Sequence, residues 1–161
     1  LTLPINVTDN ISPYLANNAA KIKASTDSIT WAVNGDDDAS VAFAARLMER
    51  GVQVRVIDKA TQLGQETLVR GSVVITITDN PNNTNLVALI NETAAETVLS
   101  IQNIKTGYGT GDMPEWGGEH FALLRQPQIA IISQAGTSSN DVGVTWWSLD
   151  THLGSRHSQL D

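Results

Sequence analysis

Short apolar runs and amphipathic segments alternate along this chain, separated by polar and glycine-containing stretches. Runs rich in valine and isoleucine predict strands, and apolar residues spaced three or four positions apart predict helices. The predicted strands are residues 27–33, 52–58, 67–79, 99–104, 128–133 and 156–161. The predicted helices are residues 12–24, 41–51, 86–98 and 141–153.

Strands that alternate with helices favour a parallel sheet, because a helical crossover returns the chain to the starting edge. We therefore expect an α/β fold with three layers, in which a mostly parallel sheet carries helices on both faces, as in flavodoxin-like and Rossmann-like proteins. Residues 1–26 form a lead-in segment with the first helix, and residues 27–161 form a single α/β domain. Within it, residues 105–121 are rich in glycine and read as an ordered loop.

Charge and composition narrow the classes of function. The net charge of -7 disfavours binding to nucleic acid or to anionic membranes, which require basic patches. The chain has no cysteine, which excludes disulfides, thiolate metal ligands and a cysteine nucleophile. No apolar run approaches the roughly 18–20 residues of a membrane span. The chain starts with Leu1 rather than methionine, which indicates a processed or excised fragment.

The loop after the strand at 128–133 is one candidate binding site, with Ser138, Ser139 and Asn140 as its residues. In a parallel sheet it would lie at the carboxyl edge, where ligands usually bind. However, SQAGTSSNDVG is neither a dinucleotide fingerprint nor a phosphate loop. Asp141 would repel a phosphate, and all these residues are ordinary helix caps, so a structural cap is the favoured interpretation.

A second candidate is the acidic turn formed by Asp36, Asp37 and Asp38, which occupies the equivalent place after the first predicted strand. Its carboxylates suit a hard divalent cation, although the spacing of an EF-hand loop is absent. Carboxylates also stabilise a helix N-terminus without any ligand. A solvated cap is again favoured over a cation site.

Other chemistry has weaker support in the sequence. His120, His152 and His157 do not fit the spacing of a catalytic zinc motif, and GxSxG is absent. Trp116 in the glycine-rich loop either contacts a neighbouring domain or packs in the core. The adjacent Trp146 and Trp147 point about 100° apart on a helix, so we expect one on the sheet and the other at a boundary or partner surface.

Several segments together resemble the region after the catalytic domain in large secreted M14-family zinc carboxypeptidase-like proteins. These segments are ITWAVNGDDDASVAFAARLMERGVQVRVID, LVRGSVVI and LLRQPQIAIISQAGTSSNDVGVTWWSLDTHLG. The last contains the family's helix motif at Gly143, Trp146, Leu149, Asp150, Leu153 and Gly154. In that family the region is described as class I glutamine amidotransferase-like, with a flavodoxin-like fold.

The resemblance implies a non-catalytic accessory domain that packs beside or assists the peptidase domain in cis. It implies a secreted or periplasmic location, with zinc bound by the parent's catalytic domain and no cofactor in this fragment. It also allows a peptide or small-molecule ligand. One alternative is a free-standing small-molecule-binding domain that uses the loops at the carboxyl ends of its strands, and another is an enzyme with an unrecognised serine or carboxylate site.

Overall fold

The computed structural model describes residues 21–134 and 136–161. Its largest element is a five-stranded sheet with the order β6-β1-β5-β2-β7, in which all neighbouring strands run antiparallel. These strands are β1 (Thr30–Val33), β2 (Arg55–Ile57), β5 (Val73–Thr76), β6 (Gln102–Ile104) and β7 (Phe121–Leu123). Between β2 and β5 the chain forms a hairpin of β3 (Thr61–Leu63) and β4 (Glu66–Leu68).

Two helices connect strands of this sheet, and each connection passes over one intervening strand. Helix α2 (Ala39–Glu49) joins β1 to β2, which lie on either side of β5. Helix α3 (Leu86–Thr97) joins β5 to β6, which lie on either side of β1. Two interleaved units of this kind make the split βαβ topology of ferredoxin-like folds. We call residues 21–123 the sheet unit.

The expectation of a mostly parallel, flavodoxin-like sheet is therefore wrong. The first predicted crossover does exist as β1–α2–β2, but β5 is inserted between its two strands and runs antiparallel to both. No helix separates β2 from β5, and parallel neighbours need a long crossover, usually a helix. The 67–79 run is also two strands, because the chain turns at Gly71, where φ is 88°.

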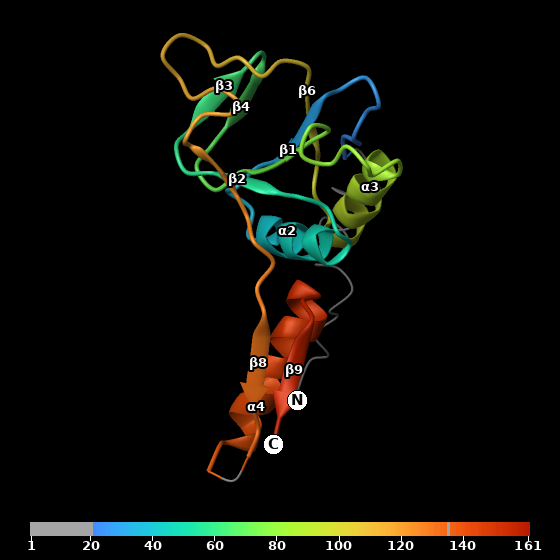
Figure 1. The fold of residues 1–161 in the computed structure, drawn as a ribbon, viewed down its shortest axis with the longest axis vertical. Coiled ribbons are helices and arrows are strands. Elements are labelled where there is room, and N and C mark those ends of the chain that lie inside the picture. The colour runs from blue at the N-terminus through green and yellow to red at the C-terminus, as the bar shows by residue number, and fades with distance from the viewer. Residues whose placement is uncertain (1–20, 135) are drawn as a thin grey trace, which may run out of the picture.

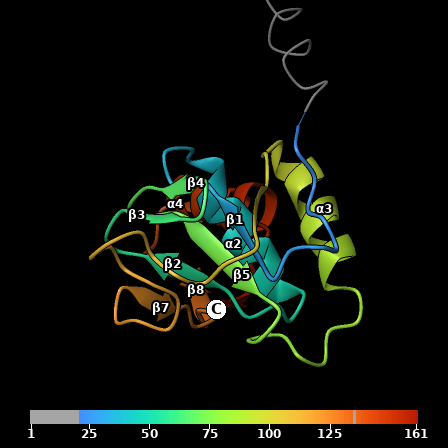
Figure 2. The same ribbon diagram turned by 90° about the horizontal axis from the view of Figure 1, so that it is seen from above.

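Both faces of the sheet are covered, and a separate apolar cluster lies on each. One cluster joins Trp31, Phe43, Leu47 and Ile90 to the strands beneath α2 and α3. The other lies under the β3–β4 hairpin, on the opposite side of the sheet from α2 in Figure 1. Seen from above, α3 and β7 lie on opposite sides of the unit (Figure 2). Burial on both faces explains why every residue of β1 and β5 is buried and why all but one threonine in each strand are apolar, a pattern that is typical of parallel strands.

Most other predicted elements are present with shifted ends. Helices α2 and α3 occupy the predicted segments, and Gly51 follows α2 with φ at 78°. The strand predicted at 52–58 is reduced to β2, and that at 99–104 to β6. Most of the helix predicted at 12–24 lies outside the described residues, and residues 21–24 have no helical structure.

The last part of the chain leaves the sheet unit and forms a separate βαβ arrangement, which projects beyond α2 in Figure 1. Strand β8 (Ile129–Ile132) is followed by helix α4 (Ser139–Trp147), a π-helical turn η2 (Ser148–Leu153) and strand β9 (His157–Leu160). Strands β8 and β9 are parallel and form a sheet of their own. This element order is the predicted one. We call residues 128–161 the βαβ unit.

Charged residues of α2 hold the βαβ unit against the sheet unit. The Arg46 guanidinium donates to the main-chain oxygens of Thr151 and His152, at 3.4 and 3.3 Å, near the end of η2. The Arg156 main-chain N–H donates to a Glu49 carboxylate oxygen at 2.7 Å. A cation at the carboxyl end of a helix is favourable, because the unpaired carbonyl groups there are negative. We call these contacts the joint.

Candidate docking surface

The βαβ unit combines ordinary local structure with little burial. Ser138 caps α4 by accepting a hydrogen bond from the Asp141 main-chain N–H, and the helical segment ends at Gly154, where φ is 67°. No residue of α4 or η2 is buried. In β8 only Ile131 is buried, and in β9 no residue is. Helices and sheets gain most of their stability by burying an apolar face. The βαβ unit buries little of its apolar surface and so gains little stability in this way.

The two faces of the β8–β9 sheet differ sharply. Ile129 and Ile131 alternate with Ala130 and Ile132, so each pair points to one face. Ile131 is 7% exposed and Trp146 of α4 meets the ring of His157 edge-on, which places α4 over their shared face. The opposite face carries Ala130, Ile132, Ser158 and Leu160, all exposed. We call these four residues the open face.

Two large apolar side chains lie side by side on the open face. Ile132 and Leu160 are partners in the parallel register and are 55% and 52% exposed. Parallel sheets are normally covered on both faces, because the crossovers place helices there. In the described residues this face of the β8–β9 sheet is uncovered, which makes the open face a candidate docking surface.

The outer side of α4 adds a second exposed apolar area. Val144 and Trp147 are three positions apart, so they lie on one side of the helix, and Trp147 is 55% exposed. Trp146, in contrast, reaches toward the sheet and contacts His157. The two tryptophans thus point in different directions as expected, but Trp146 is 44% exposed, so neither of them is packed into a core.

The predicted loop site lies at the carboxyl ends of β8 and β9 as expected. Ser139 helps to line a hollow of about 530 Å³, together with Ser133, Thr137, Trp146 and Gln159. Ser138 is engaged as the helix cap, Asn140 is exposed, and neither lines the hollow. The Ser133 hydroxyl donates to the Asp161 carboxylate at 2.8 Å. The negative charges of Asp141 and Asp161 do not favour an anionic ligand.

The acidic turn lies in the sheet unit, between β1 and α2. Asp37 accepts a hydrogen bond from the Ala39 main-chain N–H at 2.9 Å, and the Asp36 main-chain N–H donates to Asn34 at 3.1 Å. Asp38 is the residue before the first helical position and makes no side-chain cap bond. Among the described residues, no hydrogen bond joins this turn to the loop with Ser138, Ser139 and Asn140. The turn has the local structure of a helix start.

Trp116 packs inside the sheet unit. Its ring meets Phe121 edge-on with centroids 5.4 Å apart, and the Arg55 guanidinium lies 5.1 Å from its centroid. Arg55 in turn pairs with both carboxylate oxygens of Asp79, at 2.8 and 2.9 Å. The Arg55 hydrogen bond lowers the pKa of Asp79 more than burial raises it. Trp116 thus covers a structural ion pair.

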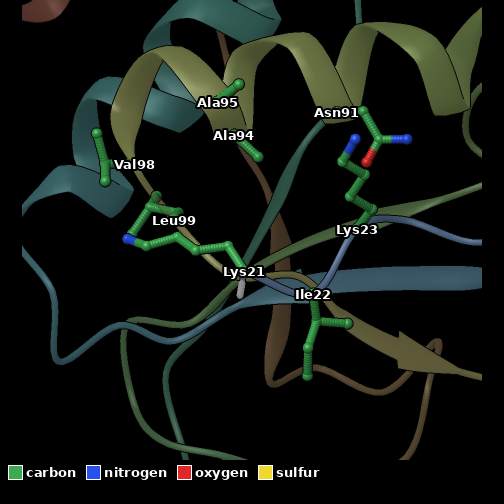
Figure 3. Close-up of a pocket in the computed structure, with 8 residues that line it drawn as sticks. All are labelled: Lys21, Ile22, Lys23, Asn91, Ala94, Ala95, Val98 and Leu99. Atoms are coloured by element: carbon green, nitrogen blue, oxygen red, sulfur yellow. The ribbon is translucent and has the colours of Figure 1, made fainter. Parts of the chain in front are cut away.

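Another hollow, of about 340 Å³, lies between α3 and residues 21–23 (Figure 3). Ala94, Ala95 and Val98 form its helical wall. Asn91 points into this region, but its amide is occupied by both main-chain groups of Ala24. A ligand site normally has several polar groups that converge on it. This hollow has none free beyond the flanking lysines.

In the part of the chain that the structure describes, no cluster of three or more His, Cys, Asp or Glu side chains is placed to hold a metal ion. His120 bonds to Asp58 at 2.8 Å, and His157 is within 3.2 Å of the Ser155 carbonyl. Among the described helices, none has the length and apolar character needed to cross a bilayer.

Sequence reasoning missed the open face and the joint. A signal for the open face exists in the contrast between the apolar IAII of β8 and the polar HSQL of β9. No comparable signal marks Arg46 and Glu49, because their partners lie more than a hundred positions away. Comparison of the chain with protein-family models, with curated proteins and with solved structures found no match.

Proposed function

We propose that this chain is a non-catalytic accessory module that packs against a neighbouring domain through its βαβ unit. The observation that carries the proposal is the contrast in burial between the two parts. The sheet unit encloses two apolar clusters, whereas α4 and β9 bury no residue. An apolar surface on an otherwise well-packed chain is typical of an interaction site.

The polar groups near this surface support a structural role. The Ser133 hydroxyl bonds to Asp161 and accepts from Gln159, and the Ser138 hydroxyl caps α4. A catalytic serine is usually activated by a histidine or lysine within hydrogen-bonding distance of its oxygen. Among the described residues, the partners of these two hydroxyls are the Asp161 side-chain carboxylate, the Gln159 amide and main-chain groups, with no histidine or lysine among them.

The nature of the neighbour rests on the resemblance to M14-family zinc carboxypeptidase-like proteins. In this proposal the module lies in cis beside the peptidase domain of a secreted or periplasmic parent, and zinc belongs to that domain. The motif residues that carry the resemblance, including Trp146 and Gly154, belong to the βαβ unit. Gly154 adjoins Arg46 at the joint, so the motif serves packing.

Sequencing the reading frame on both sides of this chain tests the parent. We expect an HxxE motif with a distant histidine upstream of Leu1, behind a signal peptide. A start codon immediately before Leu1 would contradict the accessory role in a peptidase-like protein.

If the reading frame encodes a neighbouring domain, a second experiment adds that domain to the purified chain. Amide exchange at Trp147 and Leu160 should slow, with Ile90 in the core as the unaffected control.

A second candidate function is small-molecule binding by the loop at Ser133–Asp141, without the acidic turn at Asn34–Asp38, which belongs to the other sheet. The hollow lined by Thr137, Ser139 and Gln159 favours this candidate. A ligand that binds only the folded chain raises its melting temperature. A thermal shift with a panel of nucleotides and sugars, abolished by Ser139→Trp, would support binding. No shift at millimolar ligand would remove this candidate.

A further inference from the structure

The two strands of the βαβ unit differ in the kind of neighbour that they suit. Strand β8 has the sequence IAII, and strand β9 has the sequence HSQL. In parallel sheets the central strands are continuously apolar, and polar residues are common on strands that stay at an edge. The β8 sequence is therefore typical of a central strand, although in the described residues β9 is its single neighbour.

Hydrogen bonding identifies the edge of β8 that is free. The Ser133 N–H donates to the Leu160 carbonyl at 2.8 Å, so the main chain of Ser133 points toward β9. Along a strand, successive residues direct their main-chain groups to opposite edges. The N–H and C=O groups of Ala130 and Ile132 therefore point away from β9, toward an edge on which the described residues place no strand.

The size of the open face decides what can cover it. Four residues at about 3.3 Å each and two strands about 4.8 Å apart give a face of roughly 13 by 10 Å. That is less than a fifth of the about 800 Å² that each partner contributes to a standard interface. Two copies packed face to face would bury too little for a stable dimer. A stable occupant has to use the free edge as well as the face.

The lack of charged residues on β8 limits the kind of neighbour that this strand can accept. No residue of β8 or of the open face is charged, although the whole chain has a net charge of -7. Exposed edge strands usually carry charges that prevent further pairing. This edge lacks that protection, which fits an uncharged, apolar neighbour.

We propose that β8 accepts a strand from a neighbouring α/β domain. That strand is apolar and parallel to β8, and a helix of the same domain covers Ile132 and Leu160. This inference rests on the proposed function and specifies the partner. The β8–β9 sheet and the sheet of the neighbouring domain would then form one continuous sheet with β9 at its outer edge.

The test uses the 161-residue chain and a short soluble peptide with a central Val-Val-Ile-Val run between lysines. We expect this peptide to slow amide exchange at Ala130 and Ile132 by about tenfold or more. A spin label at the amino end of the peptide should broaden signals near Ile129 rather than near Ser133, because the strands are parallel. A peptide with proline in its central run is the control and should have no effect.

Two matched proline variants assign the edge. Ala130→Pro removes an N–H from the free edge of β8, whereas Gln159→Pro removes one from the outer edge of β9. Proline is tolerated where the missing N–H faces away from a strand. Only Ala130→Pro should abolish the peptide effect, while protection of the Ser133 amide reports that β8 and β9 remain paired. If Ala130→Pro disrupts the pairing of β8 with β9, the variant Ile132→Lys, which places a charge on the open face, is used in place of Ala130→Pro.

Three results of the peptide experiment would overturn the inference: protection along β9 instead of β8, an antiparallel label pattern, or no protection while the Ser133 amide stays protected. Protection of Ala130 that rises with chain concentration, without peptide, would identify a second copy as the occupant and would also overturn it. The accessory role is judged separately, by the flanking reading frame and by exchange at Trp147 with the neighbouring domain. Strand addition can thus fail while that role stands.

Discussion

The sheet unit and the βαβ unit are built from the same motif, a helix that connects two strands, yet only the first is closed. In the sheet unit each crossover encloses a strand from the other, so β1 and β5 acquire neighbours on both edges and cover on both faces. The βαβ unit has one crossover, two strands and an open face. Interleaving two crossovers is what turns a marginal motif into a stable core.

The same residue type should therefore have very different energetic importance in the two units. Trp31 is 1% exposed beneath the helices, and its indole N–H donates to the Ser25 carbonyl. Trp31→Ala should lower the free energy of unfolding by about 4 kcal/mol, because it leaves a large cavity. Trp147→Ala should change it by less than about 0.5 kcal/mol. Urea unfolding followed by circular dichroism measures both, and equal losses would refute the contrast in burial.

Glycines extend the comparison to the backbone. A Cβ on Gly35 would lie 2.3 Å from the main chain of Gly71, so Gly35→Ala forces two loops apart. We expect a loss of about 2–3 kcal/mol, as for other overpacked sites. At Gly143 in α4 a Cβ meets nothing within 4 Å. Gly143→Ala should instead favour that helix by about 0.5–1 kcal/mol, visible as slower amide exchange in α4.

The ion pair under Trp116 should matter more than the ion pair that Arg156 forms with Glu49 at the joint, where Nε lies 3.1 Å from a carboxylate oxygen. Asp79 accepts two hydrogen bonds from Arg55 and one from Thr76, and its side chain is only 17% exposed. Asp79→Asn should cost about 2 kcal/mol, because it leaves Arg55 without its charged partner. Glu49→Gln at the joint should cost less than about 1 kcal/mol, since Arg156 is largely solvated. Thermal or urea unfolding at neutral pH compares them.

The Asp79 pair also predicts a dependence on pH. The pKa of Asp79 is lower in the folded chain than its ordinary value of about 3.9, so the unfolded state binds more protons in this range. The stability from this pair is fully present above the ordinary pKa and is lost as the pH falls through the folded pKa. The difference in the free energy of unfolding between the unsubstituted chain and Asp79→Asn should shrink below about pH 4. A difference that stays constant would contradict the assignment.

The smallest effects are expected at the helix starts. Asp37→Ala removes a 2.9 Å bond to the Ala39 N–H and should cost about 1 kcal/mol. Ser138→Ala removes a longer bond of 3.4 Å to Asp141, so we expect a smaller loss, confined to α4. Amide exchange at the start of each helix measures the two losses. A larger effect at Ser138 would show that α4 depends on its cap more than its geometry indicates.

The sequence predicted the local structure better than the topology. Helices α2, α3 and α4 could be read from apolar spacing and from Gly51, which are local signals. The pairing of β1 with β5 depends on which strand is inserted where, and continuous apolar runs do not distinguish a parallel strand from an antiparallel one covered on both sides. The missing helix between β2 and β5 was the available clue, because it makes parallel neighbours there unfavourable.

The candidate site was less predictable than the fold. The loop at Ser138 and the acidic turn at Asp37 could be recognised as helix starts, and the structure shows hydrogen bonds of that kind. The open face could not be found from the chain order alone, because exposure of Leu160 and Ile132 depends on what does not pack against them. Trp116 was equally uncertain, since its contact with Arg55 joins residues 61 positions apart.

The joint has a consequence for how ionic conditions act on this protein. Arg46, Glu49 and Arg156 attach the βαβ unit through charged groups, while the exposed side chains of Ile132 and Leu160 on the open face are apolar. Salt screens exposed charges, and excluded salts such as sulfate strengthen apolar association. Sulfate should thus loosen the attachment and tighten the docking. In the arrangement that we propose, concentrated salt would therefore keep the βαβ unit on its neighbour and free the sheet unit to move relative to it.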